Sequence, residues 1–143
     1  MLPKQYEVAH SHPPAGPPPQ LVLVSEPQSV GAARGWVREF VGSRLPAASG
    51  ERAGDIELVV SELVTNAIRY GSEPGDSVLV VLAVLPAFVR VEVHDPVRRR
   101  PRVRAVSRQR ARGRGLFIVA ALAERWGVEE RPFGKRIWAE LAR

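Results

Sequence analysis

The spacing of hydrophobic positions predicts an alternation of short strands and longer helices along this chain. Apolar runs bounded by turn residues predict five strands: "LVLVS" from Leu21, "DSVLVVLAVL", "FVRVEVHD", "GVEERP" and "KRIWAEL". Apolar residues three or four positions apart predict helices over about 29–44, from 49–55 to about 70, and over about 115–126. This order predicts an α/β two-layer sandwich in which helices cover one face of a mixed, largely antiparallel sheet.

The first twenty residues differ from the rest of the chain. They contain six prolines and no hydrophobic period, which predicts an extended or disordered arm over 1–20 and a single domain over 21–143. No apolar run suits a membrane span or a secretory signal, so we expect a cytoplasmic protein. Without cysteine, the chain has no disulfides, thiolate metal sites or cysteine nucleophiles.

The positive charge of the chain is concentrated in one segment. Nine arginines and no acidic residue lie between Arg98 and Arg114, while the remaining 12 basic and 15 acidic residues give a net charge of −3. A solvated loop is one interpretation of this segment. Nucleic-acid binding is an alternative that the sequence disfavours, because no aromatic residue separates the arginines and could stack on bases.

The stretch "SELVTNAIRYG" carries the first candidate chemistry. At about 100° per residue, Glu62 and Asn66 lie about 40° apart on a polar stripe beside the apolar face of the second helix. They would line a cavity if another part of the protein covered this stripe. The alternative is a solvated helix face on which Glu62 pairs with Arg69 or Arg52. The apolar face itself comprises Ile56, Val60, Leu63 and Ala67.

Two further stretches contribute residues suited to binding a ligand. "VEVHDP" ends a strand at Asp95 directly before a proline, where the chain leaves the sheet and the carboxylate is held at the strand terminus. "RGRGLF" places Gly113 and Gly115 on either side of Arg114 at the start of a helix, whose exposed amides and positive dipole suit a phosphate.

In this order and spacing, the motifs resemble those of the GHKL superfamily of ATP-binding domains. This is the Bergerat fold, or histidine-kinase-like ATPase fold, shared by gyrase and histidine kinases, and the chain is most similar to the single-domain anti-sigma factor serine kinases common in actinobacteria. "SELVTNAIRYG" resembles the N box and "VEVHDP" the first glycine box. "GRGLFIVAALAERWG" and "GKRIWAEL" resemble the second glycine box and the closing strands, so the resemblance covers about 21–141.

The resemblance implies a role for each candidate residue. Asn66 would hold the Mg²⁺ that bridges the phosphates of ATP, and Glu62 would act as general base toward a seryl hydroxyl of a partner protein. Asp95 would accept a hydrogen bond from the exocyclic amine of adenine. The nucleotide phosphates would be held by residues at the start of the third helix: Arg112, Gly113, Arg114, Gly115 and the amide of Leu116.

The function implied by the resemblance is that of an ATP-binding regulatory protein. It would be an anti-sigma factor with serine/threonine-protein kinase activity toward an anti-anti-sigma antagonist of the STAS type, with a sigma factor as second partner and a homodimer as the assembly. A nucleotide-gated binding module without phosphoryl transfer remains the main alternative. Two positions depart from the family pattern: Pro96 follows Asp95 in place of a glycine-containing turn, and Arg136 replaces a threonine expected to support Asp95.

Overall fold

Five strands form one antiparallel sheet in the computed structural model, which describes residues 18–96 and 116–143. The strands lie in the order β1-β2-β3-β5-β4. Every pair of neighbouring strands is antiparallel, so the expectation of a mixed sheet is wrong for the described residues. The strands are β1 (Gln20–Val24), β2 (Ser77–Val84), β3 (Phe88–Asp95), β4 (Arg125–Arg131) and β5 (Gly134–Ala142).

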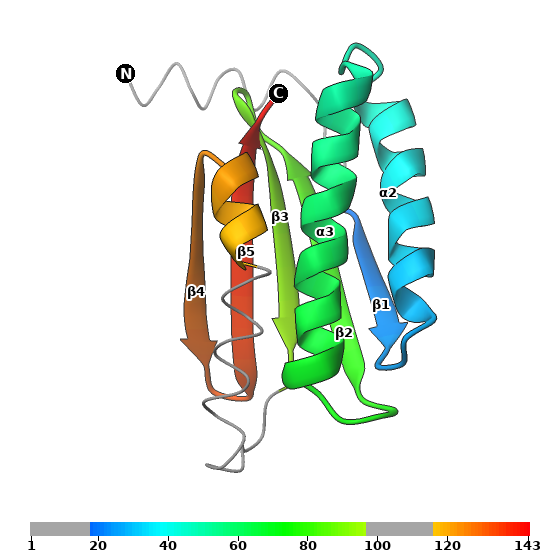
Figure 1. The fold of residues 1–143 in the computed structure, drawn as a ribbon, viewed down its shortest axis with the longest axis vertical. Helices are drawn as coiled ribbons and strands as arrows, with labels where there is room; N and C mark the ends of the chain where they lie inside the picture. Colours follow the sequence, from blue (N-terminus) through cyan, green and yellow to red (C-terminus); the bar gives the residue numbers. More distant parts are fainter. Residues whose placement is uncertain (1–17, 97–115) are drawn as a thin grey trace.

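Connections between the strands explain this topology. Helices α2 (Ser29–Arg44) and α3 (Gly50–Tyr70) run in opposite directions and return the chain to the end of the sheet where β1 stops, so β2 starts antiparallel to β1 (Figure 1). Short turns then join β2 to β3 and β4 to β5, which is possible only between antiparallel neighbours. The predicted bounds of α2 and α3 are confirmed.

The third helix ends earlier than the sequence predicts. It covers residues 116–122 and lies with α2 and α3 on one face of the sheet (Figure 1). Residues 125 and 126, which the sequence predicts as the end of this helix, belong to β4 instead. The Glu124 amide just before them donates to the Glu140 carbonyl at 2.8 Å, so this part of the chain pairs with β5. None of the helices in the described ranges is long and apolar enough to cross a membrane.

The hydrophobic core lies between the helices and the inner face of the sheet. The predicted apolar face of α3 is confirmed, since Ile56, Val60 and Leu63 are fully buried and Ala67 is nearly so. Burial of each large aliphatic side chain contributes about 1.5 to 3 kcal/mol to stability. The strand residues that face these helices are also buried: Val78, Val80, Leu82, Val89, Val91, Val93, Ile137, Ala139 and Leu141.

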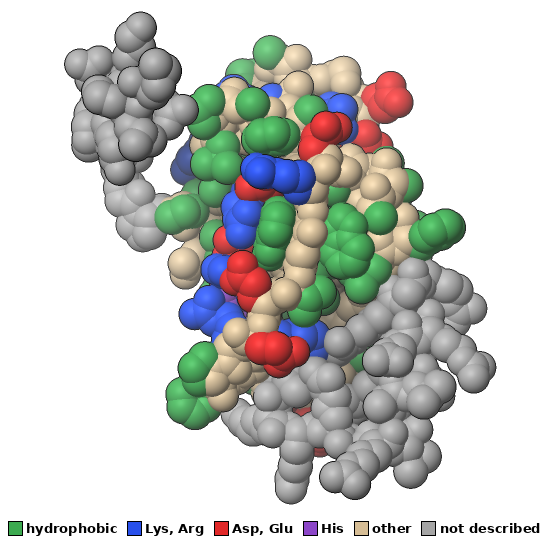
Figure 2. Space-filling model, turned by 90° about the vertical axis from the view of Figure 1, so that its left-hand side faces the viewer, with side chains coloured by type: hydrophobic (Ala, Val, Ile, Leu, Met, Phe, Trp, Pro, Cys, Tyr) green, Lys and Arg blue, Asp and Glu red, His purple; other side chains and the backbone are tan. Residues whose placement is uncertain are grey.

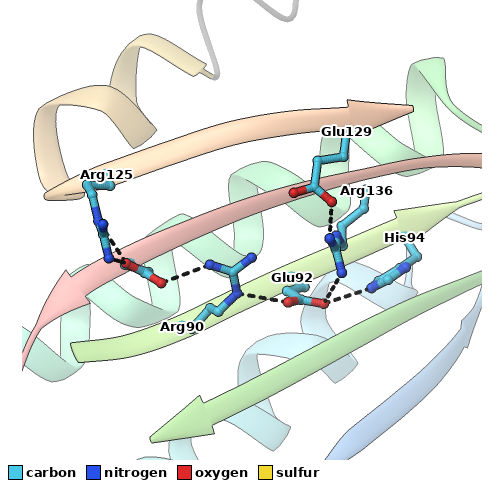
Figure 3. A network of polar contacts seen from close by, with 7 residues as sticks. Arg90, Glu92, His94, Arg125, Glu129 and Arg136 are labelled. Carbon is cyan, nitrogen blue, oxygen red and sulfur yellow. Dashed lines mark hydrogen bonds and ion pairs between the residues drawn. The ribbon is translucent and has the colours of Figure 1, made fainter. Parts of the chain in front are cut away.

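A band of charged side chains occupies the opposite face of β3, β4 and β5. We call it the outer-face network, and it comprises Arg90, Glu92, His94, Arg125, Glu129, Arg136 and Glu140 (Figure 3). Arg90 donates at 2.8 Å both to Glu92 and to Glu140, and its guanidinium lies 4.3 Å from the Trp138 ring centroid. These contacts let a half-buried face remain polar without leaving a charge unpaired.

Glu140 is the most buried carboxylate of the outer-face network. Its burial acts to raise its pKa, but hydrogen bonds and charges from Arg90 and Arg125 outweigh that effect and hold the pKa below the ordinary value of 4.5. A carboxylate whose pKa is lowered on folding stabilises the fold above its unfolded pKa, and this stabilisation is lost as the pH falls through the folded value.

A Glu140→Gln variant is therefore expected to lose about 1 to 3 kcal/mol of unfolding free energy at neutral pH, because Arg90 and Arg125 lose a charged acceptor. Below about pH 4.5, its stability should also depend less on pH than that of the wild type. Urea unfolding between pH 3 and pH 7 measures both effects, with exposed Glu130→Gln on β4 as the control. Parallel pH profiles for Glu140→Gln and wild type would contradict this role of Glu140.

Strand β4 forms one edge of the sheet. Figure 2 shows this side of the molecule, where Arg, Lys, Asp and Glu side chains lie in a band beside hydrophobic side chains. Among the exposed hydrophobic residues of this region, Trp126 is 37% and Val128 45% exposed. Both side chains point toward the helix side of the sheet, since they alternate with the outer-face residues Arg125 and Glu129. The edge is therefore mixed in polarity, not a continuous apolar surface.

Candidate functional site

The C-terminal end of α3 meets the end of β3 at Gly71. The helix starts at the N-cap Ser49, whose hydroxyl accepts from the Arg52 amide at 3.0 Å, and it ends at Gly71 with φ −112°. A left-handed cap is therefore not the reason for glycine here. A Cβ atom at position 71 would lie 2.2 Å from Oδ2 of Asp95, so glycine leaves the space that the Asp95 carboxylate occupies.

Gly71→Ala is expected to destabilise the protein by about 1 to 3 kcal/mol, because the added methyl group overlaps a buried carboxylate. Gly54→Ala, also on α3, is the matched control: nothing lies within 4 Å of its added Cβ atom. In a helix interior, that change should stabilise the protein by about 0.5 to 1 kcal/mol. Urea denaturation of both variants measures the contrast. A Gly71→Ala variant as stable as Gly54→Ala would show that the Asp95 carboxylate moves aside without cost.

Asp95 faces the helices at the last position of β3. It is 6% exposed and pairs in register with Lys135 on β5. The Lys135 ammonium lies 3.3 Å from Oδ2 of Asp95, and the two side chains are 2% and 3% exposed. Lys135 is not among the site residues expected from the sequence. A signal was present, because Lys135 alternates in phase with the buried Ile137 of the same strand.

Arg136, which the sequence places where the family pattern has a threonine that supports the aspartate, does not lie beside Asp95. It follows Lys135 on β5 and therefore points to the opposite face of the sheet. There its guanidinium contacts Glu129 and lies 3.5 Å from Glu92, as part of the outer-face network (Figure 3). The side chain next to the Asp95 carboxylate on β5 is Lys135.

The β4–β5 turn packs closely against the backbone of Asp95. Gly134 has φ +149°, and a Cβ atom there would lie 1.9 Å from the Asp95 carbonyl oxygen. Glycine is therefore required for this approach. Asp95 and Lys135 line a pocket of about 330 Å³ together with His94 and residues 131–134. Its volume lies within the range of about 300 to 1,000 Å³ typical of small-molecule sites.

Asn66 lies on α3, before the Gly71 end of the helix. It is 5% exposed, and its buried Nδ2 atom has no hydrogen-bond partner in the described parts of the chain. Leaving a buried amide donor without a partner costs about 1 to 3 kcal/mol, so a partner from outside the protein, such as a ligand or a water molecule, is expected there. The Nδ2 donor of Asn66 is thus available to a ligand.

Glu62 lies one helical turn before Asn66 and is half-buried. Within residues 18–96 and 116–143, it forms no ion pair with Arg69 or Arg52. Arg52 instead pairs with Asp55 at 3.3 Å. The alternative interpretation of Glu62 as one member of a surface ion pair is therefore not observed.

Glu62 and Asn66 lie one behind the other along α3. Asn66 precedes Gly71 by about 7.5 Å along the helix axis, and Glu62 precedes Asn66 by about another 6 Å.

Leu116 is half-buried at the start of the helical segment 116–122 and packs against the core. The other predicted phosphate contacts, Arg112, Gly113, Arg114 and Gly115, lie outside the described residues, so this part of the site remains a prediction.

Comparison with known proteins identifies the family to which this chain belongs. Residues 23–141 match the family model described as "Histidine kinase-like ATPase domain", and the chain belongs to this family. Membership in the family implies ATP binding. The histidine kinase domain of the blue-light-activated histidine kinase from Erythrobacter litoralis EL346 is similar at 19% identity and a TM-score of 0.46, over 96% of this chain and 68% of that one. A search of the curated proteins finds no match.

Proposed function

We propose that this domain is an anti-sigma factor with protein serine/threonine kinase activity. It would bind ATP, transfer the γ-phosphoryl group to a seryl hydroxyl of an anti-anti-sigma protein of the STAS type, and sequester a sigma factor when that antagonist is phosphorylated. The observation that carries this proposal is the pair Glu62 and Asn66. They lie one turn apart on α3, and neither side chain forms a hydrogen bond or an ion pair with another described residue.

The Asp95 end of the site would hold the base. Its carboxylate is an acceptor and suits the exocyclic amine of adenine, whereas guanine presents a carbonyl oxygen at the same position. Gly71 and Gly134 let the helix end and the β4–β5 turn approach Asp95 closely on two sides. The acceptor would thus be held in a fixed position before the base binds.

The Asn66 end would hold the phosphates. An amide oxygen is a suitable hard ligand for Mg²⁺. The Nδ2 atom of Asn66 has no hydrogen-bond partner among the described residues, so no contact there fixes the amide with its oxygen turned away from a metal, and the side chain fits this role. Bound Mg²⁺ would neutralise phosphate charge during transfer. The remaining phosphate contacts that we propose come from Arg112, Gly113, Arg114, Gly115 and the amide of Leu116.

Glu62 would act as the general base. Its carboxylate would take the proton from the seryl hydroxyl of the partner as the seryl oxygen forms a bond to the γ-phosphorus and ADP leaves. Because Glu62 forms no ion pair among the described residues, its carboxylate is available to accept this proton. Its place one turn before Asn66 sets it at the phosphate end of the site.

The partners that we propose are the sigma factor, the STAS-type antagonist and a second copy of this chain. They rest on the resemblance of the motifs in "SELVTNAIRYG" and "VEVHDP" to anti-sigma factor kinases. Such partners would place the protein in the cytoplasm. The second candidate function, a nucleotide-gated binding module without transfer, is favoured by Pro96, which takes the place of the glycine-containing turn after Asp95.

Calorimetry of the purified chain with Mg²⁺-ATP, Mg²⁺-ADP and Mg²⁺-GTP tests the nucleotide part of the proposal. We expect binding of both adenine nucleotides and weaker binding of GTP. Incubation of the chain with labelled ATP and a STAS-type protein of the same cell then tests transfer. Nucleotide binding without labelling of the partner, combined with a partner affinity that changes with ATP, would support the binding module instead.

A further inference from the structure

Lys135 places a hydrogen-bond donor beside the acceptor of Asp95. The two groups are 3.3 Å apart on neighbouring strands, and both side chains are almost fully buried. A buried ion pair is weak evidence for a stabilising role, because desolvation of the two charges offsets much of their attraction. Both residues also line the pocket beside the β4–β5 turn, where they can contact a ligand.

We propose that Lys135 determines specificity for the adenine base by donating a hydrogen bond to the ring nitrogen beside its exocyclic amine. Asp95 would accept from the amine at the same time. This inference rests on the proposed nucleotide site and adds a residue that reads the base. Adenine presents this pairing of an amine donor and a ring acceptor on two edges, through N1 on one and N7 on the other.

The geometry of the pair fits two adjacent hydrogen bonds. Bonds from the base of about 2.9 Å can run side by side to a donor and an acceptor that are separated by 3.3 Å. An ammonium has three N–H donors and a carboxylate has about four acceptor positions, so the ion pair can persist while each group also contacts the base. Guanine would place its carbonyl oxygen against the Asp95 carboxylate on either edge, which opposes binding.

The surrounding residues hold this donor and acceptor in place. Asp95 and Lys135 are paired in register across β3 and β5, and the space for the Asp95 carboxylate depends on Gly71. Gly134, directly before Lys135, brings the β4–β5 turn against the Asp95 carbonyl. A recognition pair on two paired strands keeps its spacing better than one on separate loops.

Calorimetry with ATP, 1-deaza-ATP and 7-deaza-ATP tests the inference, because each analogue lacks one ring nitrogen. The wild type is expected to bind one of the two analogues about tenfold or more worse than ATP, since a hydrogen bond from a charged donor is lost. Which analogue is affected identifies the edge that Lys135 reads. Lys135→Met should bind that analogue and ATP equally well.

Arg136→Met is the matched control, because its side chain lies on the opposite face of the sheet and its variant should discriminate as the wild type does. If Lys135→Met does not fold, the double variant Asp95→Asn with Lys135→Met leaves no buried charge without a counter-ion and should likewise bind both ligands equally.

Two results would overturn the inference while leaving the proposed function intact. The first is equal binding of all three nucleotides by the wild type. The second is a Lys135→Met variant that binds every ligand more weakly by the same factor, which would give Lys135 a purely structural role. Failure of the wild type to bind ATP at all would instead overturn the proposed function, and the inference with it.

Discussion

A Glu62→Gln variant is expected to phosphorylate the anti-anti-sigma partner roughly a hundredfold or more slowly than the wild type. Glutamine keeps the size of the side chain and its place one turn before Asn66, but it cannot take a proton from the incoming seryl hydroxyl. Loss of a general base typically costs about 10² to 10⁴ in rate. The affinity for Mg²⁺-ATP should stay close to that of the wild type, because Glu62 is not proposed to contact the nucleotide.

The Glu62→Gln substitution is expected to leave the fold unchanged. Glu62 is half-buried and forms no ion pair within the described residues, so the loss of its charge breaks no contact that stabilises the fold. Transfer of label from ATP to the partner measures the rate, and calorimetry measures the affinity. Glu51→Gln in the first turn of α3 is the control, since Glu51 is exposed and lies far from Asn66 along the helix.

Two outcomes of this experiment would change the assignment. Equal labelling by wild type and Glu62→Gln would show that Glu62 is not the base. No labelling by either protein, in the presence of an ATP-dependent change in partner affinity, would favour the nucleotide-gated module.

Asn66→Ala is expected to abolish binding of Mg²⁺-ATP without unfolding the protein. The variant removes the amide oxygen that we propose as the metal ligand. Asn66 is 5% exposed, so the change also acts on the interior: it removes a buried polar group without a partner in the described residues and leaves a small cavity. These effects oppose each other, and we expect the unfolding free energy to stay within about 1 kcal/mol of the wild type.

Calorimetry and thermal denaturation together check the prediction for Asn66. Ser61→Ala is the matched control, because Ser61 is also a buried polar residue of α3 and its hydroxyl accepts a long hydrogen bond of 3.5 Å from Arg34. That variant should keep its nucleotide affinity. A folded Asn66→Ala protein that still binds Mg²⁺-ATP as the wild type does would remove Asn66 from the site.

The elements of this fold could be predicted from the sequence because their signals are local. The bounds of α2 and α3 follow from apolar spacing, from Ser49 as N-cap and from Gly71 after the last turn. The end of β3 at Asp95 follows from the proline after it. In contrast, the third helix ends early because β5 offers backbone partners to the residues after it, and those partners lie far along the chain.

The sequence by itself therefore determined the order of elements, the apolar face of α3 and the candidate residues Glu62, Asn66 and Asp95. Only the tertiary structure decided which residue of β5 stands beside Asp95. Neighbouring residues of a strand point to opposite faces, so the register of β3 with β5 turns Lys135 inward and Arg136 outward. The need for glycine at Gly71 was equally hidden, because the carboxylate that requires the space comes from a distant strand and meets the helix end only in the folded chain.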